Sequence, residues 1–416
     1  MLHAYRSPAA VREAVRYKTA APAQGQAAGQ ASGGAGAKAA PVLNPWPFPV
    51  GVLGTENVSD YNETVTMGAG AQRFPDVKVE PDGWLRGLWF DIAGVVTGNT
   101  STVTFAGDTA TGTGAPFSAI NTVLFRDTGG EQIFGPFNGF DWENIDKFGA
   151  YQSLGDPRAD LNYSTTNSSS ATGAGSFHFT LYLPLEISAA DALGDVENRS
   201  ENSIYRVELT LEQSSVVYTT APSSLPAVTV ITTQDSYTEP VAAMALSGRP
   251  VSSAPPSPGS LQYWKQEDDT MPGTSSSTLI TNGIGNGYRN IIFKLIRTSG
   301  TRANGQSDWP NPLELTLGTS RIRNLYTKSW MDKTGRAFGL TSATADTALG
   351  WENGVFPMWF TQDVGIKPGD EARRKYLRTK TGNTFKVRGT FANAGTLYIT
   401  SNYIVPRSND FSQIVA

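Results

Sequence analysis

Residues Phe177 to Glu212 read FHFTLYLPLEISAADALGDVENRSENSIYRVELTLE, and this stretch decides the fold class. Large apolar residues occupy every second position from Phe177 to Leu185 and again from Tyr205 to Leu211. Successive side chains of a β-strand point to opposite faces, so this period of two predicts two strands, each with one buried face. Between them, Ser188 to Val196 opens with a serine followed three residues later by an aspartate, which predicts a short helical turn.

The second half of the chain repeats this pattern. Asn290 to Gly300 (NIIFKLIRTSG) echoes Asn121 to Gly130 (NTVLFRDTGG): in both, an Asn opens an apolar strand that ends in Arg and a Gly-containing turn. A less periodic, partly helical stretch from Ile322 to Trp351 takes the place that Ser188 to Val196 has in the first half. The two halves therefore share an order of elements, which indicates an internal repeat.

The chain ends in a further pair of predicted strands. Phe385 to Phe391 and Leu397 to Val405 both alternate in period two, and a turn at Asn393 to Gly395 separates them. This pattern predicts a β-hairpin.

Length and composition agree with an all-β protein of two domains. The 416 residues exceed the roughly 250 to 300 at which a single core stops growing. The 43 glycines and 25 prolines suit many short strands joined by loops, as in a sandwich or barrel. We expect helix to be the minority state.

The N-terminal region predicts a mobile arm. Ser7 to Lys18 is a short, basic, amphipathic helix by its spacing, and Thr19 to Pro41 consists almost wholly of small and polar residues that cannot form a core. We expect folded structure to begin near Asn44 to Pro49 (NPWPFP), because proline keeps the residue before it extended. The region has no continuous apolar run, so we expect a soluble protein without an export signal.

Charge and residue counts exclude several kinds of chemistry. The formal net charge is -4, which demands no nucleic-acid partner. There is no cysteine, and the two histidines are His3 and His178, so disulfides, thiolate nucleophiles, His-based triads and multi-His metal sites cannot form. We expect His178 to be a polar surface or interface residue, and we expect no cofactor and no metal.

Two other segments match a known binding motif only in part. Gly283 to Gly287 lacks the spacing and the Lys of a phosphate loop, so we expect a connection between strands. Glu267, Asp268 and Asp269 lack the alternating oxygen ligands of a calcium loop, and we expect a solvated charged loop.

The densest candidates for a glycosidase acid pair are carboxylates between Phe137 and Phe148: Asp141, Glu143 and Asp146. Their aromatic neighbours favour a loop pinned to a core over a sugar platform.

The pattern as a whole resembles the major capsid proteins of tectiviruses, the tailless phages with a membrane beneath the protein shell. The resemblance lies in three stretches. Phe179 to Glu212 is similar to the segment between the F and G strands of that family's first jelly roll, and Ile120 to Tyr151 is similar to a strand, a turn and a loop with Gly-aromatic steps in the same family. Phe356 to Pro368, together with Thr384 to Ser408, is similar to the closing strands of the family's second jelly roll. It covers most of the chain in order, with few identities.

The resemblance implies two consecutive eight-stranded β jelly rolls with short inter-strand helices and a flexible N-terminal arm. The expected divisions are an arm and tether at 1–43, a first jelly roll at 44–240, a second at 241–406 and a C-terminal tail at 407–416. The implied function is that of a non-enzymatic major capsid protein, found in the virion and assembled in the host cytoplasm.

The implied partners are other copies of the chain and the rest of the shell. Homotrimers would tile an icosahedral shell, contact neighbouring trimers and vertex or minor capsid proteins, and bind no nucleic acid specifically. Four cations of the arm would face an internal membrane or tie neighbouring trimers: Arg6, Arg12, Arg16 and Lys18. The alternative is a secreted or surface β-sandwich that binds carbohydrate, suggested by Trp and Tyr near Gly-rich segments and by the acidic pI of about 5.4.

Overall fold

The computed structural model describes residues 45–98, 102–107, 113–149, 156–167, 173–240, 249–256, 261–303, 307–341, 348–361 and 373–405. The chain divides into two units, Met1–Leu43 and Asn44–Ala416, and every described residue belongs to the second unit. The predicted arm helix over Ser7 to Lys18 and the tether over Thr19 to Pro41 lie outside the described residues.

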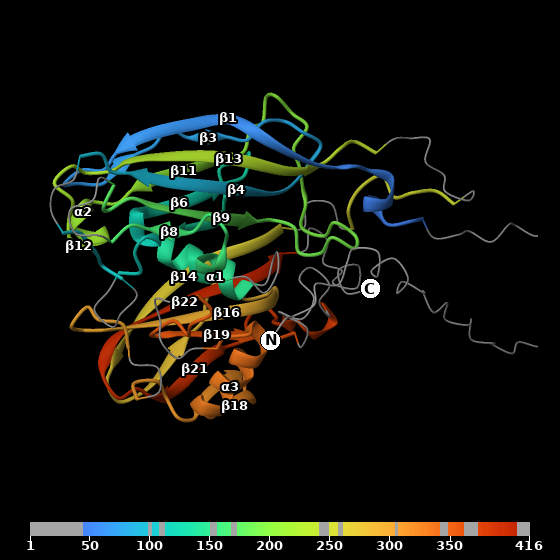
Figure 1. The fold of residues 1–416 in the computed structure, drawn as a ribbon. Helices are drawn as coiled ribbons and strands as arrows, with labels where there is room; N and C mark the ends of the chain where they lie inside the picture. The colour runs from blue at the N-terminus through green and yellow to red at the C-terminus, as the bar shows by residue number, and fades with distance from the viewer. Residues whose placement is uncertain are drawn as a thin grey trace, which may run out of the picture. The chain divides into compact units, whose positions relative to one another are not determined.

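The first half of the second unit is a sandwich of two antiparallel sheets, which Figure 1 shows in blue and green. Its elements are β1 (Gly54–Thr66), β2 (Gln72–Arg73), β3 (Val77–Lys78), β4 (Trp84–Val95), β5 (Thr104–Phe105), β6 (Ile120–Arg126), β7 (Gln132–Phe137), α1 (Gly139–Gly149), β8 (Ser164–Thr165), β9 (Phe177–Pro184), β10 (Val196–Glu197), β11 (Arg206–Leu211), α2 (Ser214–Val217), β12 (Tyr218–Thr220) and β13 (Ala227–Tyr237). One sheet has the order β1-β13-β4-β9, and the other has the order β2-β11-β6-β7. β3 also pairs with β11, on the same side as β2.

The second half has its own sandwich. Its elements are β14 (Leu261–Pro272), β15 (Ser275–Leu279), β16 (Gly287–Arg297), β17 (Leu313–Leu317), β18 (Ser320–Leu325), α3 (Thr327–Phe338), β19 (Val355–Trp359), β20 (Leu377–Arg378), β21 (Phe385–Thr390) and β22 (Ala394–Val405). One sheet contains β14-β22-β16-β19 and the other β15-β21-β17-β18.

Both sandwiches have the same topology. We count the long strands of each half in chain order, take β2 and β3 together as one strand, and leave out the short strands β5, β8, β10, β12 and β20. Among the described residues, each half then has one sheet in the order 1-8-3-6 and an opposing sheet in the order 2-7-4-5. This is the order of an eight-stranded jelly roll, so the chain folds as two consecutive jelly rolls, as the sequence predicts.

The two rolls share a sheet and a core. β14 of the second roll pairs in parallel with β7 of the first at Trp264 and Phe134, which joins the 2-7-4-5 sheet of the first roll to the 1-8-3-6 sheet of the second. A continuous cluster of buried apolar side chains runs through both rolls, and Trp264 at their junction is 1% exposed. None of the helices in the described residues is long and apolar enough to cross a bilayer.

The alternation in Phe177 to Leu185 and Tyr205 to Leu211 is confirmed, since these segments form β9 and β11. The predicted position of these two strands within the jelly roll is wrong. β9 and β11 are the sixth and seventh strands of the first roll, rather than its fifth and sixth, and they lie in opposite sheets.

The helical turn predicted at Ser188 to Val196 is also wrong. This segment is a series of tight turns that ends in β10, with a bridge between Ser188 and Leu193. Ala192 has φ 61° and Gly194 has φ 99°, and an α-helix cannot continue through residues with positive φ. Ser188 and Asp191 thus have the spacing of a capping box, but no helix follows them.

The hairpin predicted at the C-terminal end is wrong as well. β21 and β22 follow each other closely, but β21 pairs with β15 and β17, whereas β22 pairs with β14 and β16. The turn at Asn393 to Gly395 carries the chain from one sheet to the facing sheet. Each strand has one buried face, and the two buried faces meet across the core instead of lying side by side.

The internal repeat exists, but its predicted alignment is wrong. Asn121 to Gly130 and Asn290 to Gly300 both form a strand and a glycine turn, as predicted. However, β6 is the fourth strand of its roll and β16 the third of its own. The true counterparts include α1 and α3, each of which connects the fifth and sixth strands of its roll.

Candidate functional site: the seam between the two rolls

Helix α1 lies between the two jelly rolls and is buried on nearly all sides (Figure 1). The side chain of Asn138 caps its first turn by accepting a hydrogen bond of 2.8 Å from the Asp141 backbone N–H. Gly139 starts the helix against the first roll, because a Cβ there would lie 1.9 Å from the carbonyl oxygen of Phe117. The sequence predicted a loop pinned to a core at this position; the attachment is confirmed, but the element is a helix.

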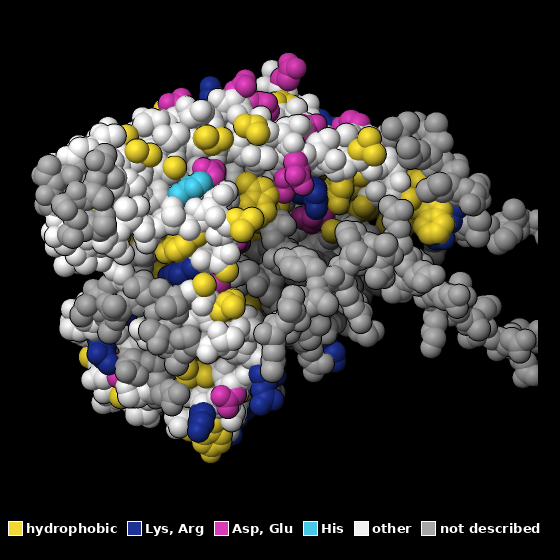
Figure 2. All heavy atoms as spheres, in the orientation of Figure 1, with side chains coloured by type: hydrophobic (Ala, Val, Ile, Leu, Met, Phe, Trp, Pro, Cys, Tyr) yellow, Lys and Arg dark blue, Asp and Glu magenta, His cyan; other side chains and the backbone are white. Residues whose placement is uncertain are grey.

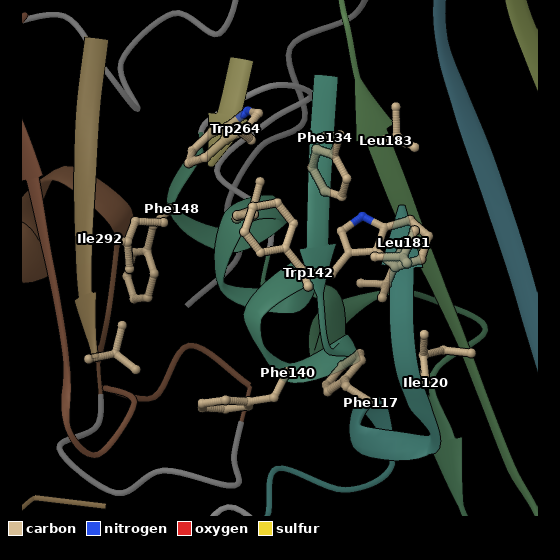
Figure 3. Close-up of a cluster of buried hydrophobic side chains, with 14 of the residues drawn as sticks. Phe117, Ile120, Phe134, Phe140, Trp142, Phe148, Leu181, Leu183, Trp264 and Ile292 are labelled. Atoms are coloured by element: carbon tan, nitrogen blue, oxygen red, sulfur yellow. The ribbon is translucent and has the colours of Figure 1, made fainter. Parts of the chain in front are cut away.

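Aromatic side chains attach α1 to both rolls. Trp142 packs edge to face against Phe90 of the first roll, with ring centroids 5.1 Å apart, and its Nε1–H donates to the carbonyl oxygen of Tyr182 at 2.7 Å. Phe148 packs in the same way against Phe338 of α3 in the second roll, at 5.5 Å. Figure 3 shows Trp142 and Phe148 extending from α1 in different directions within this buried cluster.

Charged side chains of α1 complete the attachment. Asp141 forms an ion pair with Lys294 on β16, and both side chains are 7% exposed. Its second carboxylate oxygen accepts a hydrogen bond of 3.2 Å from Gln266 on β14. Each of these bonds joins the first roll to the second.

A group of five buried charged side chains lies at the other end of α1. Lys147 contacts Asp156 at 2.8 Å and also pairs with Glu352 of the second roll. Arg158 contacts Glu143 at 2.9 Å and Glu352 at 2.7 Å through one guanidinium nitrogen. All five side chains are at most 2% exposed. We call Glu143, Lys147, Asp156, Arg158 and Glu352 the seam network.

The seam network contains more acids than bases. Three carboxylates meet two cations, and one oxygen on each of Glu143 and Glu352 accepts no hydrogen bond among the described residues. Burial raises the pKa of Glu143, against the opposing effect of Arg158 and Lys147. Removing a cation would therefore leave negative charge in the core without compensation, and such charges are costly.

Asp146, on the side of α1 that faces β9, is partly buried and accepts a hydrogen bond of 3.1 Å from the Tyr182 backbone N–H. Burial raises the pKa of Asp146 from 3.8 to about 8. Because the folded state holds this proton more tightly than the unfolded state, the stability that the neutral group provides is present below pH 4 and is lost as the pH rises towards 8.

We expect Asp146→Asn to remove this loss. At pH 8.5 the variant should be more stable than the wild type by about 1–2 kcal/mol, a value reduced for the partial exposure of the group. Urea unfolding at pH 5 and pH 8.5 measures the difference. Glu201→Gln, at an exposed carboxylate, is the matched control and should leave the pH profile unchanged. Parallel pH profiles for Asp146→Asn and the wild type would contradict this account of the site.

The three carboxylates considered as glycosidase candidates thus have structural roles. Asp141 and Glu143 are paired with cations in the core, and Asp146 accepts a backbone hydrogen bond. Among the described residues, no group of three or more His, Asp or Glu side chains is placed to hold a metal ion. The arrangement joins the two rolls through buried charges.

The remaining sequence candidates have simple positions. His178 is on the exposed side of β9, 2.8 Å from Asp91, as expected for a polar surface residue. Gly283 to Gly287 connects β15 to β16, as expected. Glu267, Asp268 and Asp269 were expected in a loop, but they lie within β14.

The predicted arm cations lie outside the described residues: Arg6, Arg12, Arg16 and Lys18. Sequence reasoning missed Lys147, Arg158 and Glu352, which meet only in the folded chain. It also missed Lys294, although a lysine inside the apolar run NIIFKLI was a usable signal, because a buried lysine requires a partner.

No protein-family profile matches the sequence, and a search of curated protein sequences finds no match. Among solved structures, the chain is similar to the crystal structure of the STIV MCP, with 12% identity and a TM-score of 0.58 over 88% of this chain and 99% of that chain. It is also similar to a chain in the atomic structure of Sulfolobus Turreted Icosahedral Virus, with 12% identity and a TM-score of 0.57 over 87% of this chain and 94% of that chain. A third similar structure is the major capsid protein P2 from bacteriophage PM2, with 9% identity and a TM-score of 0.50 over 86% of this chain and 98% of that chain.

These similarities establish the fold. The chain has the double jelly-roll fold that viral major capsid proteins adopt. The STIV and PM2 proteins are each matched over nearly their whole length, so the two rolls of this chain correspond to the whole of those proteins.

Proposed function

We propose that this chain is a non-enzymatic major capsid protein that assembles as trimers into the shell of an icosahedral virion. The observation that carries the proposal is the same jelly-roll order found twice in one chain, with the two copies joined by the buried seam. Three chains with two similar rolls each present six similar units around an axis, which suits a nearly hexagonal lattice. The buried seam supports this role, because a subunit that packs into a regular lattice must hold its two rolls at a fixed angle.

The proposed partners follow from this role. Each trimer contacts neighbouring trimers and the vertex or minor capsid proteins, and no specific nucleic-acid binding is required. We place assembly in the host cytoplasm and the mature protein in the virion. The division into an arm at 1–43, rolls at 44–240 and 241–406, and a tail at 407–416 belongs to the same proposal.

The proposed membrane contact depends on the N-terminal arm. Each cation near an anionic lipid surface contributes about 1 kcal/mol, so Arg6, Arg12, Arg16 and Lys18 together provide a modest attraction to an internal membrane. An arm that ties neighbouring trimers is the competing role for the same residues.

One experiment tests both parts of the proposal. We expect the full chain to sediment at three times its mass of 44.5 kDa at micromolar concentration, and to form shell-like lattices by electron microscopy. A chain lacking Met1 to Lys18 should remain trimeric but lose binding to vesicles that contain anionic lipid. A stable monomer would refute the capsid role. Equal vesicle binding by both chains would refute only the membrane role of the arm.

The carbohydrate-binding alternative has less support. A sugar platform requires exposed aromatic rings, but all nine tryptophans are buried or half-buried. Among the described tyrosines, Tyr326 alone is exposed. A glycan array on which the purified chain binds a sugar, together with the absence of any trimer, would favour this alternative.

A further inference from the structure

The two rolls carry opposite net charge, although the whole chain is close to neutral. Residues 44–240 contain 8 Lys and Arg against 24 Asp and Glu, a net charge of -16. Residues 241–406 contain 19 Lys and Arg against 11 Asp and Glu, a net charge of +8. Two domains of one fold therefore differ by 24 charges, and the formal charge of -4 for the whole chain hides this difference.

The acidic surface of the first roll includes an edge strand. Among the described residues β1 pairs with no strand other than β13, and residues 75–82 contact its other side through hydrogen bonds of Pro75, Glu80 and Asp82. Glu56 and Asp60 on this strand are exposed and Glu63 is half-exposed, and none of them forms an ion pair among the described residues. Glu80 extends the acidic surface, since its carboxylate accepts a hydrogen bond from the Asp60 backbone N–H. Val58 is 71% exposed between these acids.

The basic surface of the second roll also includes an edge strand, and its exposed charges are positive. In the part of the chain that the structure describes, β18 pairs with no strand other than β17 and is the edge strand of its sheet, and α3 follows it directly. Five cations of this segment are exposed: Arg321, Arg323, Lys328, Lys333 and Arg336. The segment contains one acid, Asp332, and Tyr326 is 63% exposed between β18 and α3. On the face shown in Figure 2, Asp and Glu gather along the margin of β1, and Lys and Arg gather around α3 and β18.

We propose that the β1 edge of one copy docks against the β18–α3 edge of a second copy. This inference rests on the proposed capsid function, because it specifies the contact that builds the trimer. Each edge places one exposed apolar side chain, Val58 or Tyr326, among charges of one sign, as in an interface with an apolar centre and a charged rim. Pairing opposite edges brings acids against bases.

The same charges select against other arrangements. A two-fold contact between two β1 edges would place acids against acids, and one between two β18 edges would place bases against bases; like charges across an interface are costly. A contact between unlike edges is heterologous, and heterologous contacts close into rings when the rotation fits. The charge difference therefore favours a closed ring in which acidic and basic rolls alternate, and it disfavours dimers.

Charge reversal tests this contact in the full chain. Glu56→Lys with Asp60→Lys makes the acidic edge basic, and Arg323→Glu with Lys328→Glu makes the basic edge acidic. At low salt, each pair of substitutions should weaken trimer formation by on the order of 100-fold, measured by sedimentation. A chain that carries all four substitutions has the original net charge and exchanged edges, and it should recover trimer formation to within about tenfold of the wild type.

The matched control changes the same charge elsewhere. Glu201→Lys with Asp268→Lys alters two exposed acids that belong to neither β1 nor the β18–α3 segment, and it should leave trimer formation nearly unchanged. Normal trimers from both single-edge variants, or no recovery in the four-substitution chain while circular dichroism shows native folding, would overturn the inference. If the variants do not fold, the salt dependence of wild-type trimer formation tests the inference. The trimers should weaken as the salt concentration rises, because salt screens exposed charges. Trimers whose stability does not depend on salt would overturn the inference.

The outcomes separate this inference from the proposed function. A wild-type chain that never forms trimers refutes the capsid proposal. Wild-type trimers that are insensitive to both charge reversal and salt refute only the contact proposed here.

Discussion

Replacing Arg158 by methionine should lower the free energy of unfolding by about 3–5 kcal/mol, because it removes one partner of a buried ion-pair network. The Arg158 side chain is 1% exposed and lies 2.9 Å from Glu143 and 2.7 Å from Glu352. Without the guanidinium, the buried carboxylates of Glu143 and Glu352, which lie in different rolls, keep Lys147 as their one nearby cation among the described residues. Methionine retains much of the apolar volume, so the expected loss reports the charge and not a cavity.

Equilibrium unfolding in guanidinium chloride measures this loss. Arg199→Met is the matched control: Arg199 pairs with Glu197 at the surface, where both side chains are about half exposed, and its loss should cost less than about 1 kcal/mol. Adding Glu143→Gln and Glu352→Gln to Arg158→Met should recover part of the stability, since the uncompensated charges are then gone. A loss below 1 kcal/mol for Arg158→Met would show that the seam network does not hold the rolls together.

The strands were predictable because their burial is periodic. In β9, Phe177, Phe179 and Leu181 are buried while His178 and Thr180 are half-exposed, and this pattern appears directly in the sequence. The internal repeat was also predicted from the sequence, but with the wrong alignment of the two halves, because strands of the same period occur several times in each roll. The partner of each strand was not, because a period of two identifies the buried face but says nothing about which sheet the strand joins.

Helix α1 was not predictable from periodicity. Its segment GFDWENIDKFG is buried on almost every side, by the first roll and by the second, so its apolar residues do not form a single stripe. Its acids were considered as glycosidase candidates, although a loop pinned to a core was favoured, because the cations that pair with Asp141 and Glu143 lie outside the segment. Arg158 is 15 residues from Glu143, and Lys294 is 153 residues from Asp141. Only the folded chain brings these charges together.

The charge difference between the rolls was present in the sequence but was concealed by the total. It becomes visible when the charges are summed separately over 44–240 and 241–406, the bounds already expected from the sequence. The edge strands that carry these charges, β1 and β18, follow from strand pairing and could not be identified from periodicity. Composition and topology together define the proposed contact, and neither suffices alone.

Trp142→Ala should be about as destabilising as Arg158→Met, by about 3–5 kcal/mol, through loss of packing. Trp142 is fully buried on α1, where it contacts Phe90 at 5.1 Å and Phe134 at 6.1 Å between ring centroids. Alanine would leave a cavity between the helix and the first roll. It would also leave the carbonyl oxygen of Tyr182 without its 2.7 Å hydrogen bond.

A second substitution at this position separates the two effects. Trp142→Phe keeps most of the apolar volume and loses the N–H donor, so it should cost about 1–2 kcal/mol, close to the penalty for an unsatisfied buried acceptor. Leu161→Ala, at a fully exposed side chain outside both proposed contact edges, is the surface control and should change stability by less than about 0.5 kcal/mol. If Trp142→Ala unfolds at nearly the wild-type denaturant concentration, α1 is not anchored through this ring, and the rolls must be held together by the charges and the shared sheet alone.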